Sequence, residues 1–82
     1  MAEIIFYGKF QDIIGPSLEL GLPEGVTSLK ELVSYLGKLY AGFSEMVLNA
    51  RTKIVLNDVI VQTDMPISDA DRIEFLPPFS GG

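Results

Sequence analysis

The strongest helix pattern in this 82-residue chain is Ser28-Leu29-Lys30-Glu31-Leu32-Val33-Ser34-Tyr35-Leu36. It opens with an S-x-x-E capping box, in which the Ser28 hydroxyl and the Glu31 carboxylate can each satisfy a free backbone N–H. Apolar residues then recur at i, i+3, i+4 and i+7, which places them on one helix face. Gly37 weakens the pattern, and Gly42 is expected to end the helix. We expect this face to pack on a sheet rather than to bind a partner.

Segments with strand character lie on both sides of this helix. They are residues 3–10, Ser17–Leu20, the runs 54–56 and 59–61 around Asn57-Asp58, and Arg72–Leu76. Residues 11–15 are expected to continue the first strand to the turn at Gly15-Pro16. The two-residue Asn57-Asp58 loop predicts a hairpin. Residues 43–53 show no clean period, so no element is predicted there.

This order of elements predicts an α+β fold with one main helix on one face of a mixed sheet of four to five strands. The first and last strands are both strongly apolar, so we expect them side by side in the middle of the sheet. That arrangement is the β-grasp, or ubiquitin-like, layout. We expect a β-grasp domain over residues 1–76 and a flexible C-terminal tail over residues 77–82.

The composition excludes several classes of function. With 6 Lys+Arg against 11 Asp+Glu, the net charge is -5, and the cations are scattered, which argues against a nucleic-acid partner. Cys and His are both absent, so there is no thiolate nucleophile, no Cys/His metal site and no Ser-His pair. The early apolar run 4–7 is too short for a membrane span or a signal peptide, and we expect a cytoplasmic protein.

Three aspartates raise the question of a metal site. Asp64, Asp69 and Asp71 do not fit the EF-hand pattern, because Arg72 and Ile73 follow where further ligands are needed. Carboxylates in a turn before a strand are usually solvated turn residues. No glycine-rich phosphate loop occurs either. We therefore expect neither a metal nor a bound cofactor.

The C-terminal tail is the most informative segment for function. Pro77-Pro78 forms a stiff, extended base, and Gly81-Gly82 forms a slim tip that can enter a narrow channel. Residues 79–82 can reach at most about 13–14 Å beyond the prolines. This design suits delivery of the terminal carboxylate into another protein's active site. The alternative is an ordinary frayed terminus of small residues.

The ending, residues 69–82, closely resembles the MoaD/ThiS family of ubiquitin-like sulfur carriers, which includes the small subunit of molybdopterin synthase. Residues 4–15 also look like the first strand and turn of that family. The chain departs from the family pattern at Asp58 and Ala70, where glycine is usual. The resemblance spans nearly the whole chain and is weakest over residues 40–53.

The resemblance implies a chemistry carried by the main chain. A ubiquitin-activating-type enzyme would use ATP to adenylate the carboxylate of Gly82, which sulfur then converts to a thiocarboxylate. The tail, Gly81 included, would enter the large subunit of molybdopterin synthase, which binds cyclic pyranopterin monophosphate. There the sulfurs of two carriers would build the dithiolene of molybdopterin. The resemblance suggests a heterotetramer, with the catalytic groups supplied by the partners. The tail positions implied are Pro77, Pro78, Phe79 and Ser80.

The alternation of the strands predicts a docking surface beside the tail. If the helix covers the side of Ile4, Phe6 and Phe75, then other side chains lie on the open face of the sheet. They are Tyr7, Ile60 and Leu76. An apolar patch of this kind is what partner binding needs, although burial on both sides of a central strand would give the same pattern.

Three other functions stay open from the sequence. The chain could carry sulfur in another pathway, such as the synthesis of the thiamin thiazole, although its length and Pro77-Pro78 favour molybdopterin. It could be a ubiquitin-like modifier joined through Gly82 to lysines of other proteins. It could also be a plain binding module with an idle tail.

Overall fold

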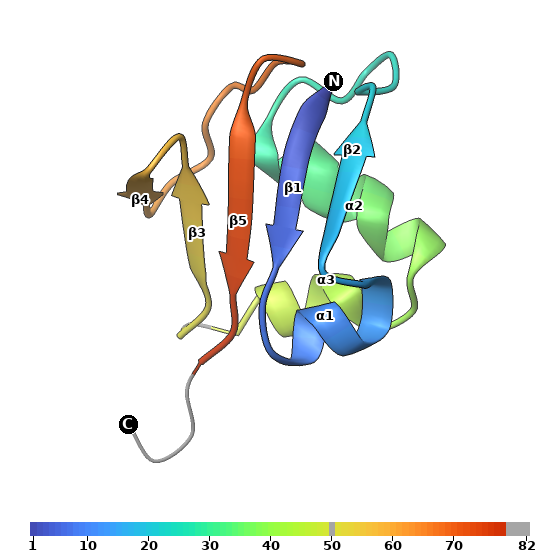
Figure 1. Ribbon diagram of the computed structural model, residues 1–82, viewed down its shortest axis with the longest axis vertical. Helices are drawn as coiled ribbons and strands as arrows, with labels where there is room; N and C mark the ends of the chain where they lie inside the picture. The colour runs from blue at the N-terminus through green and yellow to red at the C-terminus, as the bar shows by residue number, and fades with distance from the viewer. Residues whose placement is uncertain (50, 79–82) are drawn as a thin grey trace.

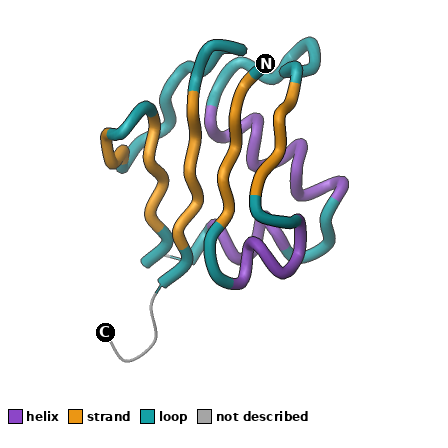
Figure 2. The backbone as a smooth tube through the Cα atoms, in the orientation of Figure 1, coloured by secondary structure: helices purple, strands orange, loops and turns teal. Residues whose placement is uncertain are grey.

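The computed structural model describes residues 1–49 and 51–78, and these form one sheet with helices on one side (Figures 1 and 2). The elements in chain order are β1 (Ala2–Phe6), α1 (Lys9–Ile14), β2 (Ser17–Leu20), α2 (Leu29–Leu39), α3 (Phe43–Val47), β3 (Lys53–Leu56), β4 (Val59–Val61) and β5 (Arg72–Leu76). Among the described residues, no helix is long and apolar enough to cross a membrane.

The sheet has five strands in the order β2-β1-β5-β3-β4. The first and last strands, β1 and β5, are parallel neighbours at its centre, and every other pair is antiparallel. α2 crosses behind the sheet, and α1 and α3 lie at the end where β1 and β5 finish (Figure 1). The predicted α+β, β-grasp architecture is therefore confirmed.

The hairpin predicted around Asn57-Asp58 is present. Both loop residues have positive φ, 48° at Asn57 and 69° at Asp58, which is the backbone of a two-residue type I′ turn. The Asn57 side chain also ties the hairpin to β5. Its Oδ1 accepts from the Arg72 N–H at 2.9 Å, and its Nδ2 donates to Asp71 Oδ1 at 2.8 Å. Asn57 thus fixes both the turn and the start of the last strand.

The helix start predicted at Ser28 is confirmed, with one difference in the pairing. Ser28 Oγ accepts from the Glu31 N–H at 3.3 Å, as a capping box requires. The Glu31 carboxylate reaches one residue further back and accepts from both Thr27 N–H, at 3.0 Å, and Thr27 Oγ1, at 2.8 Å. These hydrogen bonds lower the pKa of Glu31.

The end of α2 differs from the prediction. The helix stops at Leu39, and Gly42 instead precedes α3 with a φ of 87°. Gly37 is the point where the two helices meet, because a Cβ there would lie 1.8 Å from Ser44 Oγ. Ser44 Oγ donates to the Val33 carbonyl at 3.3 Å. The glycine that weakens the sequence pattern therefore permits close packing of α3 on α2.

The strand predicted over residues 3–10, with its extension to residue 15, is wrong beyond Phe6. Gly8 takes a positive φ of 55°, which breaks the strand, and Lys9–Ile14 is helical. Phe10 is fully buried and Ile14 packs on the core, so their i, i+4 spacing is that of a helix face. Residues 43–53, for which no element was predicted, also contain a helix. It is α3, in which Phe43 is fully buried.

The core lies between the sheet and the helices and is built around four phenyl rings. Phe6, Phe10, Phe43 and Phe75 have centroids 5.3 to 6.2 Å apart in their five contacting pairs. Aromatic pairs at these distances contribute about 0.5–1.5 kcal/mol each beyond the burial of their area. The rings come from β1, α1, α3 and β5, so the cluster fastens the end of the sheet from which the tail leaves.

Candidate functional site: the tail exit and the open face of the sheet

β5 delivers the C-terminal segment at the end of the sheet where α1 and α3 lie (Figure 1). Pro77 is buried and Pro78 half-buried, so both predicted tail prolines still rest on the folded domain. The remaining predicted tail and reaction positions are Phe79, Ser80, Gly81 and Gly82, and they lie outside the described residues. Their assigned role in sulfur transfer stays a prediction.

The alternation predicted for the central strands is present. Ile4, Phe6, Ile73 and Phe75 are fully buried against the helices. Ile5 and Glu74 are paired across β1 and β5 on the opposite face, which no helix of the described chain covers. That open face is the surface on which the partner-binding residues were predicted.

The three predicted partner-binding residues do not form one cluster. Tyr7, 38% exposed, and the half-buried Leu76 lie at the tail exit. Ile60, 58% exposed, lies on the edge strand β4 and shares the open face with its partner Val55. The sheet order places β5 and β3 between β1 and β4. Two of the three residues thus flank the tail, and the third marks the far edge of the same face.

A polar network crosses the open face beside Tyr7. The Tyr7 hydroxyl donates to Glu74 Oε1 at 2.6 Å. Arg72 bridges Glu74, with Nη2 to Oε1 at 3.8 Å, and Glu3, with Nε to Oε1 at 3.6 Å. The hydrogen bond to Glu74 is the main cause that raises the pKa of Tyr7. The network holds the Tyr7 ring over β5 and makes the face mixed rather than purely apolar.

The three aspartates act within the fold. Asp64 Oδ1 accepts from the Lys30 N–H at 2.9 Å, and Asp69 Oδ1 accepts from the Leu22 N–H at 2.8 Å. Asp71 accepts from the Asn57 side chain and, at 2.7 Å, from the Ser68 N–H, and these bonds lower its pKa. Within residues 1–49 and 51–78, no cluster of three or more potential metal-ligating side chains occurs. Each carboxylate thus has a structural role in joining a loop to a neighbouring segment.

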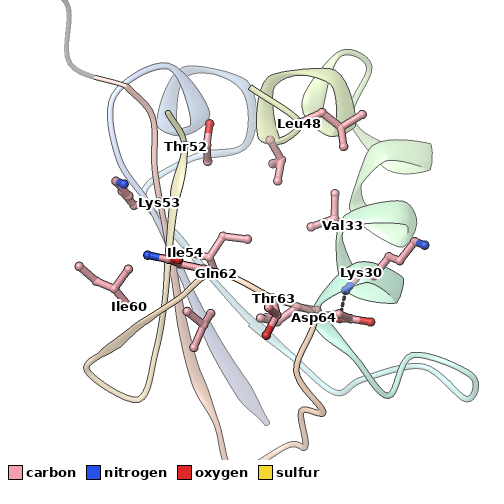
Figure 3. A pocket seen from close by; sticks show the side chains of 13 residues that line it. Lys30, Val33, Leu48, Thr52, Lys53, Ile54, Ile60, Gln62, Thr63 and Asp64 are labelled. Atoms are coloured by element: carbon pink, nitrogen blue, oxygen red, sulfur yellow. Dashed lines mark hydrogen bonds between the residues drawn. The ribbon is translucent and has the colours of Figure 1, made fainter. Parts of the chain in front are cut away.

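A groove that the sequence did not indicate lies on the helix side, between α2 and the β4 edge (Figure 3). Its volume is about 550 Å³, and its apolar lining includes Val33, Leu48 and Ile54. Asp64 also lines it, but its carboxylate is engaged by the Lys30 N–H. The groove lies between residues 29–33 and residues 61–64, which are far apart in the sequence, and no local pattern marks such a surface. Ile60 borders both the groove and the open face, because β4 is the edge strand of the sheet.

These features define a β-grasp domain whose last central strand leads directly into the C-terminal tail. The chain belongs to the ThiS family, whose model matches residues 4–82. The match includes the tail. No curated protein matches the chain significantly in sequence.

Solved structures resemble the whole chain. One is the solution structure of the Haloferax volcanii protein HVO 2177, with a TM-score of 0.81 and 19% identity, covering 99% of this chain and 85% of that one. Another is a candidate molybdopterin converting factor subunit 1 from Pyrococcus furiosus. It has a TM-score of 0.76 and 24% identity, and the match covers 95% of this chain and 97% of that one. These two show the fold.

A third similar structure is a complex of subunits 1 and 2 of the molybdopterin-converting factor from Helicobacter pylori. The matching chain gives a TM-score of 0.61 and 28% identity, and the coverages are 99% and 97%. Together with membership of the ThiS family, this likeness supports a sulfur carrier, the class that the C-terminal motif indicated.

Proposed function

We propose that this chain is the sulfur-carrying small subunit of a molybdopterin synthase. The observation that carries the proposal is the likeness, over nearly the full length of both chains, to a Helicobacter pylori protein solved in complex with its second subunit. The family match that runs to residue 82 adds the C-terminal tail to that likeness. The partners are a large subunit, in a heterotetramer, and an adenylating enzyme that uses ATP.

The proposed chemistry takes place at the Gly82 carboxylate. A carboxylate oxygen attacks the α-phosphorus of ATP, and pyrophosphate leaves, which gives an acyl-adenylate. Hydrosulfide, as the simplest sulfur donor, then attacks the acyl carbon, and AMP leaves with the original oxygen. The product is a thiocarboxylate, with one proton released and no change of oxidation state. The reacting atoms belong to the main chain, so the absence of Cys and His from this sequence is consistent with the mechanism.

The open face supplies the proposed docking surface for the large subunit. Tyr7 and Leu76 lie beside the point where the tail leaves, so a partner that covers them also receives the tail. Ile60 extends the contact toward β4. A mixed surface with an aromatic anchor and a charged network is typical of protein interfaces, which combine apolar contacts with a polar rim.

The test is transfer from the charged carrier. The chain bearing radioactive sulfur at its terminus is mixed with the large subunit and cyclic pyranopterin monophosphate. We expect the label to move into the pterin product, and a chain truncated before Gly81 to transfer none. Transfer to a thiazole precursor instead would assign the carrier to thiamin synthesis. Lysine conjugates of higher mass that need Gly82 would indicate a protein modifier.

A further inference from the structure

Gly8 and Pro77 make the tightest contact at the tail exit. Gly8 lies between β1 and α1 with φ 55° and ψ -127°, a conformation that glycine adopts readily and other residues do not. A Cβ on Gly8 would lie 2.8 Å from Pro77 Cγ and 3.7 Å from Pro77 Cδ. Pro77 is buried. The proline ring thus fills a space that exists only because residue 8 has no side chain.

The backbone holds Gly8 from both sides. The preceding residue, Tyr7, donates its N–H to the Phe75 carbonyl at 3.2 Å, which extends the β1–β5 pairing toward the tail. The Gly8 carbonyl accepts from the Gln11 N–H at 3.1 Å and from the Asp12 N–H at 3.3 Å, which fixes it to the start of α1. That helix is anchored by the buried Phe10 ring. Gly8 is therefore a rigid support rather than part of a loose loop.

We propose that Gly8 is a positioning residue for adenylation of the Gly82 carboxylate, since it seats the Pro77 ring and thereby sets the direction in which the tail leaves the domain. The inference rests on the proposed function. Proline has a fixed φ, so placing its ring also orients the chain that follows. Gly82 lies four residues beyond Pro78, and a stretch of that length reaches at most about 13–14 Å. If the tail starts in another direction, this short segment therefore cannot bring Gly82 back to the same position.

A positive φ does not by itself account for the contact between Gly8 and Pro77. Gly25 also has a positive φ, of 90°, but an added Cβ there would meet nothing within 4 Å. Alanine at either position strains the backbone, but only alanine at position 8 also displaces Pro77. Gly25→Ala is therefore the matched control for backbone strain without displacement of the tail.

The experiment measures steady-state activation of each variant by the adenylating enzyme of the same organism, as exchange of pyrophosphate into ATP, below the unfolding temperature of every variant. The variants are Gly8→Ala, Gly25→Ala, Pro77→Ala and the double variant with both changes at positions 8 and 77. We expect Gly8→Ala to lower kcat by about tenfold to a hundredfold, because a displacement of about 1 Å can cost this much, with KM nearly unchanged. Gly25→Ala is expected to keep the wild-type kcat.

The double variant separates positioning from a merely structural effect. Without the Pro77 ring there is nothing for the methyl group added at position 8 to displace, so the double variant should have the same kcat as Pro77→Ala alone. Equal kcat values for Gly8→Ala and Gly25→Ala, or effects of the two changes that multiply, would overturn the inference. If Gly8→Ala does not fold, Pro77→Ala decides, and a wild-type kcat for it overturns the inference.

The wild-type chain distinguishes failure of the proposed function from failure of the positioning role of Gly8. If it supports no exchange with an enzyme shown to be active on another carrier, the proposed function fails and this inference fails with it. If the wild-type chain reacts and Gly8→Ala reacts as well as Gly25→Ala, only the positioning role is lost.

Discussion

The two faces of the sheet differ in the side chains that they carry. The helix-covered face is packed with four phenyl rings and aliphatic side chains, and no buried polar or charged residue occurs among the described residues. The open face mixes Ile5, Val55 and Leu76 with Glu74 and Arg72, and its side chains are half-buried or exposed. Phe75 and Leu76, adjacent in β5, point to opposite faces. One face thus holds the fold together, and the other leaves side chains available to a partner.

The largest expected effect is on the covered face. Phe75→Ala removes a ring that contacts Phe6, Phe10 and Phe43, and it should lower the free energy of unfolding by about 3–5 kcal/mol. Urea denaturation followed by circular dichroism measures this loss. A loss below about 1 kcal/mol would mean that the cluster does not dominate stability.

The matched change on the open face is Leu76→Glu. It should abolish capture of the large subunit, because it places a charge on the proposed docking surface, beside the point where the tail leaves. The far-UV circular dichroism spectrum should stay native, since Leu76 lies outside the phenyl cluster. Binding at the wild-type level would remove this face as the docking surface.

Tyr7→Glu should behave in the same way, and Ile60→Glu should have a smaller effect because Ile60 lies at the sheet edge.

A smaller effect is expected where the hairpin meets β5. Asn57→Ala removes the hydrogen bonds to the Arg72 N–H and to Asp71, and it should cost about 1 kcal/mol of stability. The same change should raise the pKa of Asp71, since the Asn57 hydrogen bond is the main cause that lowers it. Because the folded-state pKa is depressed, the contribution of Asp71 is present above its ordinary value of 3.8 and is lost as the pH falls below it. An NMR titration of Asp71 that does not shift in the variant would contradict this assignment.

The smallest effect concerns the polar network of the open face. Glu74→Gln removes the carboxylate that accepts from the Tyr7 hydroxyl, so the pKa of Tyr7 should fall toward its ordinary value of 10.0. In the wild-type protein the pKa of Tyr7 is raised, so the contribution of the Tyr7 hydrogen bond to stability is present below pH 10.0. It is lost as the pH rises through the folded-state pKa of Tyr7. Ultraviolet titration of the phenolate signal measures the change, with Tyr7→Phe identifying which tyrosine responds. An unchanged Tyr7 midpoint would show that the network does not control it.

Local patterns predicted the parts of the fold that local physics determines. The capping box at Ser28, the two-residue turn at Asn57-Asp58 and the alternation of Ile73 to Leu76 each lie within a few residues. α1 was missed because β-favouring residues recur after Gly8, at Phe10, Ile13 and Ile14, and nothing nearby shows that Gly8 takes a positive φ. α3 is a single short helix whose main support is the burial of Phe43 in a cluster from other elements.

The candidate site also has features that the sequence predicted and contacts that it did not. Strand alternation was enough to place Tyr7 and Leu76 on the open face. The hydrogen bond from Tyr7 to Glu74 and the contact of Gly8 with Pro77 join residues more than sixty positions apart. Both depend on the parallel pairing of β1 with β5, which brings the first and last parts of the chain together. Such contacts have no signature in the sequence until that pairing is known.

The central claim is that this chain carries sulfur on its C-terminal carboxylate. The most direct test is the intact mass of the chain after incubation with ATP, the adenylating enzyme and hydrosulfide. We expect a mass gain equal to the exchange of one oxygen for one sulfur, and fragmentation should place it at Gly82. An unchanged mass, with an enzyme that charges another carrier in the same mixture, would contradict the claim.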